Sequence, residues 1–449
     1  MREALAAAYR YNPRLDAERA RLRATDEEVA RANSGYRPQI FGQADVGFQN
    51  QNLRPDSLAE GRTNPKGYAV NLNQNLFNGF QTTNAVREAE AGVRAGREAL
   101  RRVEAEVLLE AASAYADVVR DQAIVRLQEN NVNVLSRELK ATQDRFAVGE
   151  VTRTDLAQAQ ARRAGAVSQL DAARANLKTS RAVFKRVVGH DPSGLAEPGT
   201  PDRLLPPSVD AAMSISEQES PLVIGALYRE QAARHTVDRI RGELLPELEL
   251  DATYSNRYQQ SNVLDQNETT TVTGRLTVPI YQGGEVHARV RQAKHTHVSR
   301  LQEIEQARTE VRQEVVRSWS EYEAKRAQLG SDKTQVEANR TALLGVREEE
   351  KVGQRTVLDV LNAELELVTS EVQLERTRRD LVVAGYRVLS AIGRLDAEHI
   401  GGVAEVYDPV IHADEVRRKW YGISITHNDG RHEHLDVTPV EERRARPSK

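Results

Sequence analysis

The chain has 449 residues, of which 39% are hydrophobic, 29% are charged and 5% are aromatic. This composition is lean for a compact globule of that length, and it suits long helices with a narrow apolar stripe and much solvated surface. The net charge of −3 gives no reason to expect a nucleic-acid partner, and the absence of cysteine excludes disulfides and thiol nucleophiles.

The first segments of the chain predict a helix followed by a β-hairpin. Residues 1–35 are rich in Ala, Arg and Glu, which favours one long helix that ends at Gly35 and Pro38. Over residues 38–77 the period changes, because apolar side chains take alternate positions with polar ones between them, as in strands. The apolar positions are Ile40, Gly42, Ala44, Val46, Phe48, Tyr68, Val70, Leu72 and Leu76.

Residues 84–188 predict a helical hairpin. Apolar residues recur at heptad spacing on both sides of the dipeptide Val148-Gly149, as in a coiled coil. Glycine often ends a helix in a left-handed conformation, so we expect the turn between the two helices at this dipeptide. The segment 190–212 is rich in Pro and Gly and links this part of the chain to the next.

The same order of elements returns in the second half. Residues 214–243 favour a helix, residues 246–281 favour a hairpin with a polar loop at 259–268, and residues 285–393 favour a second helical hairpin. When the two helical tips are aligned, Val, Gly, Thr, Asp and Ala coincide at 148/352, 149/353, 152/356, 155/359 and 159/363.

We interpret this agreement as an internal duplication, with structural repeats at residues 1–205 and 210–394. A further segment, 395–422, follows the second repeat. The polar residues 423–449 are expected to be a disordered tail, although His432 and His434 leave metal binding there as an alternative.

The predicted strands need partners, because the open edges of two hairpins would be left without hydrogen bonds. If their apolar faces meet lipid, the polar faces line a lumen and the sheet must close. Bacterial barrels have even strand numbers from eight upward, so two copies would give a filled barrel and three copies a twelve-stranded channel. The alternative is a soluble sandwich that packs on the apolar faces. The sequence contains no run of 18 apolar residues, so we expect no transmembrane helix.

Several segments resemble the TolC family of outer-membrane channel-tunnels, in order over about residues 1–422. They are YRYNPRLDAERARLRA, YRPQI, LNQNLFNGF, RFAVGEVTRTDLAQAQA, VGQRTVLDVLNA and YDPVIHADEVRRKWYG. The resemblance implies an α+β membrane protein, a homotrimer in which four strands per protomer close a twelve-stranded barrel joined to a long antiparallel α-helical coiled-coil barrel. It also implies that a signal peptide preceded Met1 and was removed, and that 190–212 and 395–422 form an equatorial belt.

The resemblance also implies that the two tips form a gate. By motif, Thr154, Asp155 and Arg355 match positions whose polar bonds hold the tips closed. Glu350 stands where the family prototype has a tyrosine that bonds to the position of Asp155, so we expect the latch to be partly rewired. Asp359 matches an aspartate of the constriction ring.

Two of these expectations have alternatives. Asn362 stands where the prototype has a second aspartate, so we expect a neutral ring there and weaker block by multivalent cations. Asp359 has a simpler reading as an acid that stabilises a helix N-terminus. The tip residues Val148, Gly149, Val352 and Gly353 either only close their helices or also dock a periplasmic adaptor.

The predicted function is an outer-membrane exit duct that extends into the periplasm. It would carry small toxic compounds or drugs with an inner-membrane pump of the RND or ABC type and a periplasmic adaptor (membrane fusion) protein. The alternatives are the outer-membrane component of a type I protein secretion system and, in another class, a soluble coiled-coil scaffold. We recognise no enzyme motif, and we expect no catalytic residue, cofactor or metal.

Overall fold

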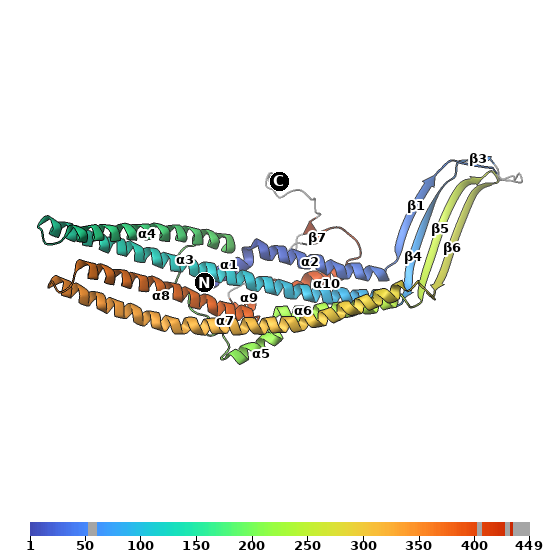
Figure 1. Cartoon of the computed structure of the whole chain (residues 1–449). Coiled ribbons are helices and arrows are strands. Elements are labelled where there is room, and N and C mark those ends of the chain that lie inside the picture. Colours follow the sequence, from blue (N-terminus) through green and yellow to red (C-terminus); the bar gives the residue numbers. More distant parts are fainter. Residues whose placement is uncertain (53–60, 402–405, 427–431, 434–449) are drawn as a thin grey trace. The chain divides into compact units, whose positions relative to one another are not determined.

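The computed structural model describes residues 1–52, 61–401, 406–426 and 432–433. It consists of long helices and a four-stranded sheet (Figure 1). The chain divides into two compact units, which we call the helical unit and the sheet unit. The helical unit comprises Met1–Ala20, Glu98–Ala226 and Ile304–Tyr407, and the sheet unit comprises Arg21–Arg97, Leu227–Glu303 and Asp408–Lys449.

The four-stranded sheet has the order β1-β4-β5-β6, and each neighbouring pair is antiparallel. The four strands are β1 Gln39–Val46, β4 Lys66–Asn78, β5 Glu247–Ser261 and β6 Leu264–Thr277. Two short strands, β2 Gln49–Gln51 and β3 Gly61–Thr63, extend the first hairpin. Both hairpins therefore lie where the alternation of apolar and polar residues predicts them.

The second hairpin differs from the prediction at both of its ends. The polar stretch 259–268 is not a long loop, because the ladder continues as far as the pair Ser261 and Leu264. Polar residues do not interrupt a strand whose side chains are solvated, and β6 is exposed along its whole length. At the other end β6 stops at Thr277, because Pro279 cannot donate a ladder hydrogen bond.

The sheet separates apolar from polar residues between its two faces. One apolar row crosses all four strands through Ile40, Leu72, Ala252 and Val272. The adjacent row on the opposite face is polar and consists of Gln39, Asn73, Asp251 and Thr273. Within that polar row the Nδ2 atom of Asn73 donates to Oδ1 of Asp251 at 2.8 Å.

The single helix predicted over residues 1–35 is wrong, because the structure has two helices there. They are α1 Arg2–Tyr11 and α2 Pro13–Asn33. Pro13 disfavours the helical conformation of the preceding residue, and Asn12 is extended with φ −77° and ψ 119°. The side chain of Asn12 holds this break, since its Nδ2 donates to the carbonyl of Val187 at 3.1 Å.

The helix predicted over 214–243 is interrupted for the same reason. The structure has α5 Val209–Glu219 and α6 Pro221–Gly242, with an extended Ser220 before the proline. The first of these begins earlier than predicted, because the Ser208 hydroxyl caps it by accepting from the backbone N–H of Ala211 at 3.2 Å.

The two helical hairpins coincide with the ranges that the heptad spacing predicts. They are α3 Gln81–Ala147 with α4 Arg153–Val188, and α7 Glu285–Lys351 with α8 Val357–Ala391. No helix in the described part of the chain combines the length and the low polarity that crossing a membrane requires.

The C-terminal part contains α9 Ala397–Ile400 and α10 Pro409–Arg418. Residues 423–449 are predicted to be a disordered tail, but two short strands within them, β7 Ile425–Thr426 and β8 His432–Glu433, are paired. Residues 427–431 and 434–449 lie outside the described residues, and that expectation stays a prediction for them.

A buried carboxyl group of α3 holds the start of α9 within the helical unit. An oxygen of Glu104 accepts the backbone N–H of Ala397 at 2.7 Å. Burial raises the pKa of Glu104 from an ordinary value of 4.5 to about 7. The folded protein therefore binds this proton more tightly than the unfolded chain does, and stability is lost as the pH rises between these two values.

We expect Glu104→Gln to remove this pH dependence while keeping an oxygen that accepts the Ala397 N–H. Thermal unfolding should show a variant more stable than the native protein at pH 8, by roughly 1–3 kcal/mol, because a neutral amide avoids burying charge. Below about pH 4.5 the two proteins should unfold alike, since the native carboxyl is then protonated in both states. The same difference at both pH values would contradict this prediction.

Candidate functional site

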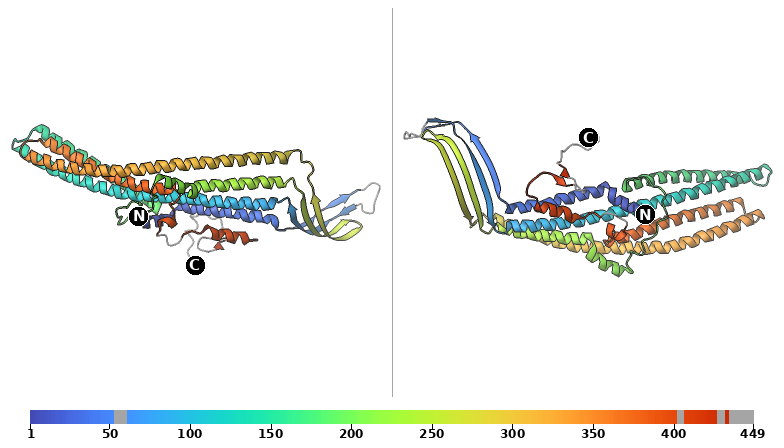
Figure 2. Two further views of the ribbon diagram at one scale, coloured as in Figure 1. Left: turned by 90° about the horizontal axis from the view of Figure 1, so that it is seen from below. Right: turned by 180° about the vertical axis from the view of Figure 1, so that it is seen from behind.

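The candidate site consists of the two helix-to-helix tips of the helical unit. The tip between α3 and α4 and the tip between α7 and α8 lie at the same end of that unit (Figures 1 and 2). Every site residue predicted from the sequence lies in or near these two tips.

Both tips end their long helix with the same backbone motif. At the first tip Gly149 donates to the carbonyl of Phe146 at 3.1 Å, and Glu150 donates to that of Arg145 at 3.0 Å. At the second tip the corresponding donors are Gly353 and Gln354, which bond at 2.9 Å each. This is a Schellman motif, and it needs the positive φ angles of 83° and 75° that the two glycines supply.

Both tips also start their second helix in the same way. Thr152 and Asp155 form a capping box in which the threonine hydroxyl accepts the N–H of residue 155 at 3.2 Å and the carboxylate accepts the N–H of residue 152 at 2.9 Å. Thr356 and Asp359 repeat it at 3.3 and 2.9 Å. These bonds satisfy backbone donors that a helix start leaves free.

The capping bonds keep both acids ionised. Hydrogen bonds from Thr152 hold the pKa of Asp155 below its ordinary value, and hydrogen bonds from Thr356 do the same for Asp359. Each tip therefore presents a fixed, partly exposed negative charge at the start of its second helix. Within one chain, the contacts of Asp359 are those of an acid at a helix N-terminus, as the simpler alternative predicts. These contacts leave part of the carboxylate accessible to solvent.

An ion pair joins the two hairpins near the tips. Arg145, four residues before Gly149, donates through Nη1 to Oε1 of Glu350 at 2.5 Å. The side chain of Glu350 is only 13% exposed, while that of Arg145 is 40% exposed. The hydrogen bond to Glu350 raises the pKa of Arg145, so this guanidinium stays charged.

A second polar contact joins α4 to α8 behind the tips. Nη2 of Arg162 donates to Oδ1 of Asn362 at 2.7 Å. The structure thus brings Glu350 and Asn362 into contacts across the hairpins. Sequence reasoning missed their partners Arg145 and Arg162, although opposite charges at the ends of the two long helices were a usable signal for the first pair.

The remaining predicted latch residues are placed differently. Arg355 bonds within its own tip, where its Nε donates to Oε2 of Glu349 at 2.9 Å, and both side chains are about half exposed. Thr154 is exposed on the first turn of α4. Together with Asp155, these residues have polar groups that face solvent in the single chain.

An apolar cluster under the tips packs the hairpins together. Its buried members come from α3, α4 and α8 and are Leu135, Ala159, Ala166, Val357 and Leu361. An ion pair between Arg347 and Glu364 lies on the same hairpin as the second tip. The tips therefore stand on a packed helical base.

The extreme ends of the tips are apolar and open. The side chains of Val148 and Val352 are 72% and 71% exposed. A Cβ atom placed on Gly149 or Gly353 would have no neighbour within 4 Å, so the described chain covers neither end. Exposed valines beside bare backbone are a suitable surface for another protein.

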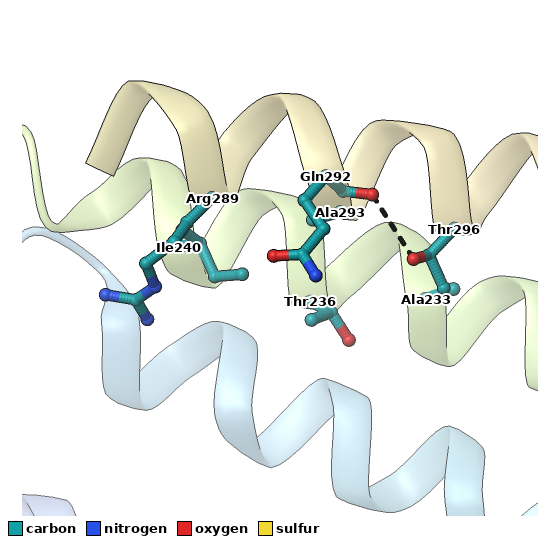
Figure 3. Close-up of a pocket in the computed structure, with 7 residues that line it drawn as sticks. All are labelled: Ala233, Thr236, Ile240, Arg289, Gln292, Ala293 and Thr296. Atoms are coloured by element: carbon teal, nitrogen blue, oxygen red, sulfur yellow. Dashed lines mark hydrogen bonds between the residues drawn. The ribbon is translucent and has the colours of Figure 1, made fainter. Parts of the chain in front are cut away.

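A small cavity lies apart from the tips, in the sheet unit. It has a volume of about 210 Å³ and lies between α6 and α7, where Ala233, Ile240 and Ala293 supply apolar walls (Figure 3). Its one charged residue, Arg289, forms two hydrogen bonds with Glu243 at 2.6 and 2.9 Å. Across the described ranges, no three His, Asp or Glu side chains gather in a way that could hold a metal ion.

The sequence model of the outer membrane efflux protein family matches residues 4–190 and 212–394. The chain is 38% identical over 94% of its length to the outer membrane efflux protein BepC of Brucella suis, 91% of which is covered. It is 25% identical to the outer membrane protein TolC of Escherichia coli, over 87% of the chain and 81% of that protein.

Two further similarities bear on use and fold. The chain is 27% identical to the alkaline protease secretion protein AprF of Pseudomonas aeruginosa, over 75% of the chain and 71% of that protein. Among solved structures, the CmeC outer membrane channel of Campylobacter jejuni superimposes with a TM-score of 0.76 at 16% identity, covering 92% of this chain and 88% of CmeC. This second similarity is one of fold.

Proposed function

The chain belongs to the outer membrane efflux protein family, and from this membership we propose that it is the outer-membrane exit duct of a tripartite export machine. The observation that carries the proposal is the sheet, which has an apolar row on one face and a polar row on the other. Its strands β1 and β6 are exposed at every position and form the edges of the sheet.

Three copies would provide hydrogen-bonding partners for the two free edges of this sheet. The free edge of β1 in one copy pairs with the free edge of β6 in the next, and the apolar rows then face lipid while the polar rows line a lumen. Twelve strands leave an open channel, whereas about eight strands are filled by their own side chains. We therefore propose a homotrimer whose barrel closes between copies, built from two structural repeats per chain.

The tips then form the gate at the periplasmic end. We assign Arg145 with Glu350 to a latch within each copy, because this pair joins the two hairpins. Thr154, Asp155 and Arg355 are assigned to bonds between neighbouring copies. This fits their exposure, and a guanidinium that uses its Nε for Glu349 still carries further donors. Asp359 supplies a ring of charges at the constriction, beside a neutral ring from Asn362.

The open ends of the tips are assigned to a protein partner. Val148, Gly149, Val352 and Gly353 would dock the hairpin of a periplasmic adaptor, which in turn joins an inner-membrane pump. Residues 190–212 and the first part of 395–422, up to Tyr407, are assigned to a belt around the helices, because the chain from Asp408 onwards belongs to the sheet unit. The proposed cargo is small toxic compounds, since the relative with 38% identity is an efflux protein.

A second use, type I protein secretion, is supported by the similarity to AprF, which is a protease secretion protein. Deleting the gene separates the two uses. Increased sensitivity to small toxic compounds with an unchanged set of secreted proteins supports efflux, and the reverse pattern supports secretion.

The channel itself is tested in a planar lipid bilayer. We expect a conductance that prefers cations, because three Asp359 carboxylates would surround a narrow axis. Asp359→Asn keeps an oxygen for the capping box but removes these charges, and the reversal potential in a salt gradient should fall towards zero. Asp155→Asn removes the equivalent charge from the other tip and should keep most of the preference. It is compared for cation preference only, because losing its proposed contact with a neighbouring copy also changes opening. A folded protein that never conducts would overturn the channel.

A further inference from the structure

The C-terminal helix α10 is firmly attached to the sheet unit. His412 on α10 forms a hydrogen bond through Nδ1 to Oδ2 of Asp26 on α2 at 2.9 Å, and the Asp26 side chain is fully buried. Val416 is 3% exposed, and Arg417 forms an ion pair with Glu90 on α3. The segment that follows α10 therefore starts from a fixed position.

That segment is tied to the foot of the sheet. Arg37 lies directly before Pro38 and the start of β1, and its Nη1 donates to the carbonyl of Lys419 at 2.9 Å. The same guanidinium lies over the ring of Trp420, 4.7 Å from the ring centroid. A cation above an indole ring is a favourable contact, so residues 419 and 420 are held beside the point where β1 begins.

The residues after this attachment are unusually exposed for their type. Trp420, Tyr421 and Ile423 are 68%, 92% and 87% exposed. The other large apolar side chains of the described residues that are more than 80% exposed also belong to the sheet or its foot, namely Val46 in β1 and the Ile280-Tyr281 pair after β6. Of these most exposed side chains, Ile280, Tyr281, Tyr421 and Ile423 therefore belong to segments that adjoin the end of the sheet where β1 begins and β6 ends.

The order of residues in this segment fits a bilayer surface. Residues 417–423 read RRKWYGI, so a basic run is followed directly by Trp, Tyr and Ile. Trp and Tyr favour the boundary between headgroups and acyl chains, and basic residues favour anionic lipid phosphates. The end of the sheet where β1 begins is its foot, and in a membrane barrel the strand ends lie where the barrel leaves the hydrocarbon region.

We propose that residues 417–423 form a lipid anchor at the periplasmic surface of the outer membrane. Trp420, Tyr421 and Ile423 enter the headgroup–acyl boundary of the phospholipid leaflet, and the exposed Arg418 lies near lipid phosphates. The anchor rests on the proposed insertion of the sheet as a barrel. It adds a contact from the C-terminal segment, outside the strands, and joins α10 to the membrane.

The absence of cysteine allows a direct test. Tyr421→Cys places the only thiol of the chain in the segment, where a fluorescent label is attached before reconstitution into phospholipid vesicles. Val148→Cys, at the open tip, is the matched control. We expect lipids brominated near the headgroup end of their acyl chains to reduce the emission at 421 to roughly half, because interfacial side chains lie about 5–10 Å into the boundary. The emission at 148 should not change.

Two results would overturn the anchor. A label at 421 that water-soluble quenchers reach and brominated lipids do not is exposed to solvent. A label that neither quencher reaches is covered by protein, which would assign the segment to a contact with another copy or a partner. Conductance is recorded from the same labelled samples, so a conducting channel without lipid quenching removes the anchor and leaves the proposed function standing.

Discussion

Gly79→Ala is expected to prevent the sheet unit from folding normally, whereas Gly283→Ala should leave it nearly intact. The two glycines hold corresponding places, after β4 and after β6, and have φ angles of 61° and 65°. A Cβ atom on Gly79 would lie 2.2 Å from the carbonyl oxygen of Gly242 and 2.9 Å from the Cβ of Leu245. A Cβ atom on Gly283 would meet nothing within 4 Å.

The comparison separates two costs of the same substitution. A left-handed alanine costs about 1–2 kcal/mol in either variant, because of its own Cβ. Only at position 79 must backbone segments also move apart, and we expect that to bring the total above roughly 3 kcal/mol. The yield of folded protein in membranes and its unfolding temperature are the measurements.

A third variant checks the reason. A Cβ atom on Gly242 would lie 2.4 Å from the carbonyl oxygen of Gly79, so Gly242→Ala should reproduce the Gly79→Ala defect although φ at 242 is ordinary. Equal, small losses of stability in Gly79→Ala and Gly283→Ala would instead mean that the backbone segments at Gly79 and Gly242 can move apart to accommodate the added methyl group.

Arg145→Glu is expected to open the proposed channel. The substitution places a second carboxylate against Glu350, whose side chain is 13% exposed and would lose its partner. Allowing for the solvent screening of the half-exposed arginine, we expect roughly 1–2 kcal/mol against the closed arrangement, or about a tenfold shift towards open channels. Single-channel recording measures this as a larger or more frequent conductance.

Charge exchange and a neighbouring pair provide the controls. The double variant Arg145→Glu with Glu350→Arg restores opposite charges and should return the conductance to that of the native protein. Arg355→Glu reports on a different contact, because the bond from Arg355 to Glu349 is half exposed and lies within one tip. Such pairs contribute little, so a large effect of Arg355→Glu would have to come from a neighbouring copy. If Arg145→Glu conducts like the native protein, this pair is not a latch.

The local features of this fold were readable from the sequence. Alternating side chains predict both hairpins, and the Val-Gly dipeptides predict the two helix-to-helix turns, which the structure shows as Schellman motifs followed by capping boxes. These features depend on residues close together in the chain, so pattern and backbone preference are sufficient to find them.

The errors have particular causes. The Ala-, Arg- and Glu-rich composition of residues 1–35 favours a single helix, and it hides the break that Pro13 causes at Asn12. The polar stretch 259–268 looked like a loop because a strand with solvated side chains lacks the alternation that identifies strands. The Arg145–Glu350 pair and the bond from Ala397 to Glu104 join residues far apart in sequence, and only the packing of helices brings them together.

The exposed sheet has a consequence for the life of a newly made chain. A protomer that has not met other copies presents two ladder edges and an apolar row, which are templates for aggregation. In the proposed trimer, strand pairing between copies contributes to folding itself, so the final structure depends on protein concentration. Dilute chains should persist as a partly folded pool that needs escorting across the periplasm, and the folded form should accumulate cooperatively as expression rises.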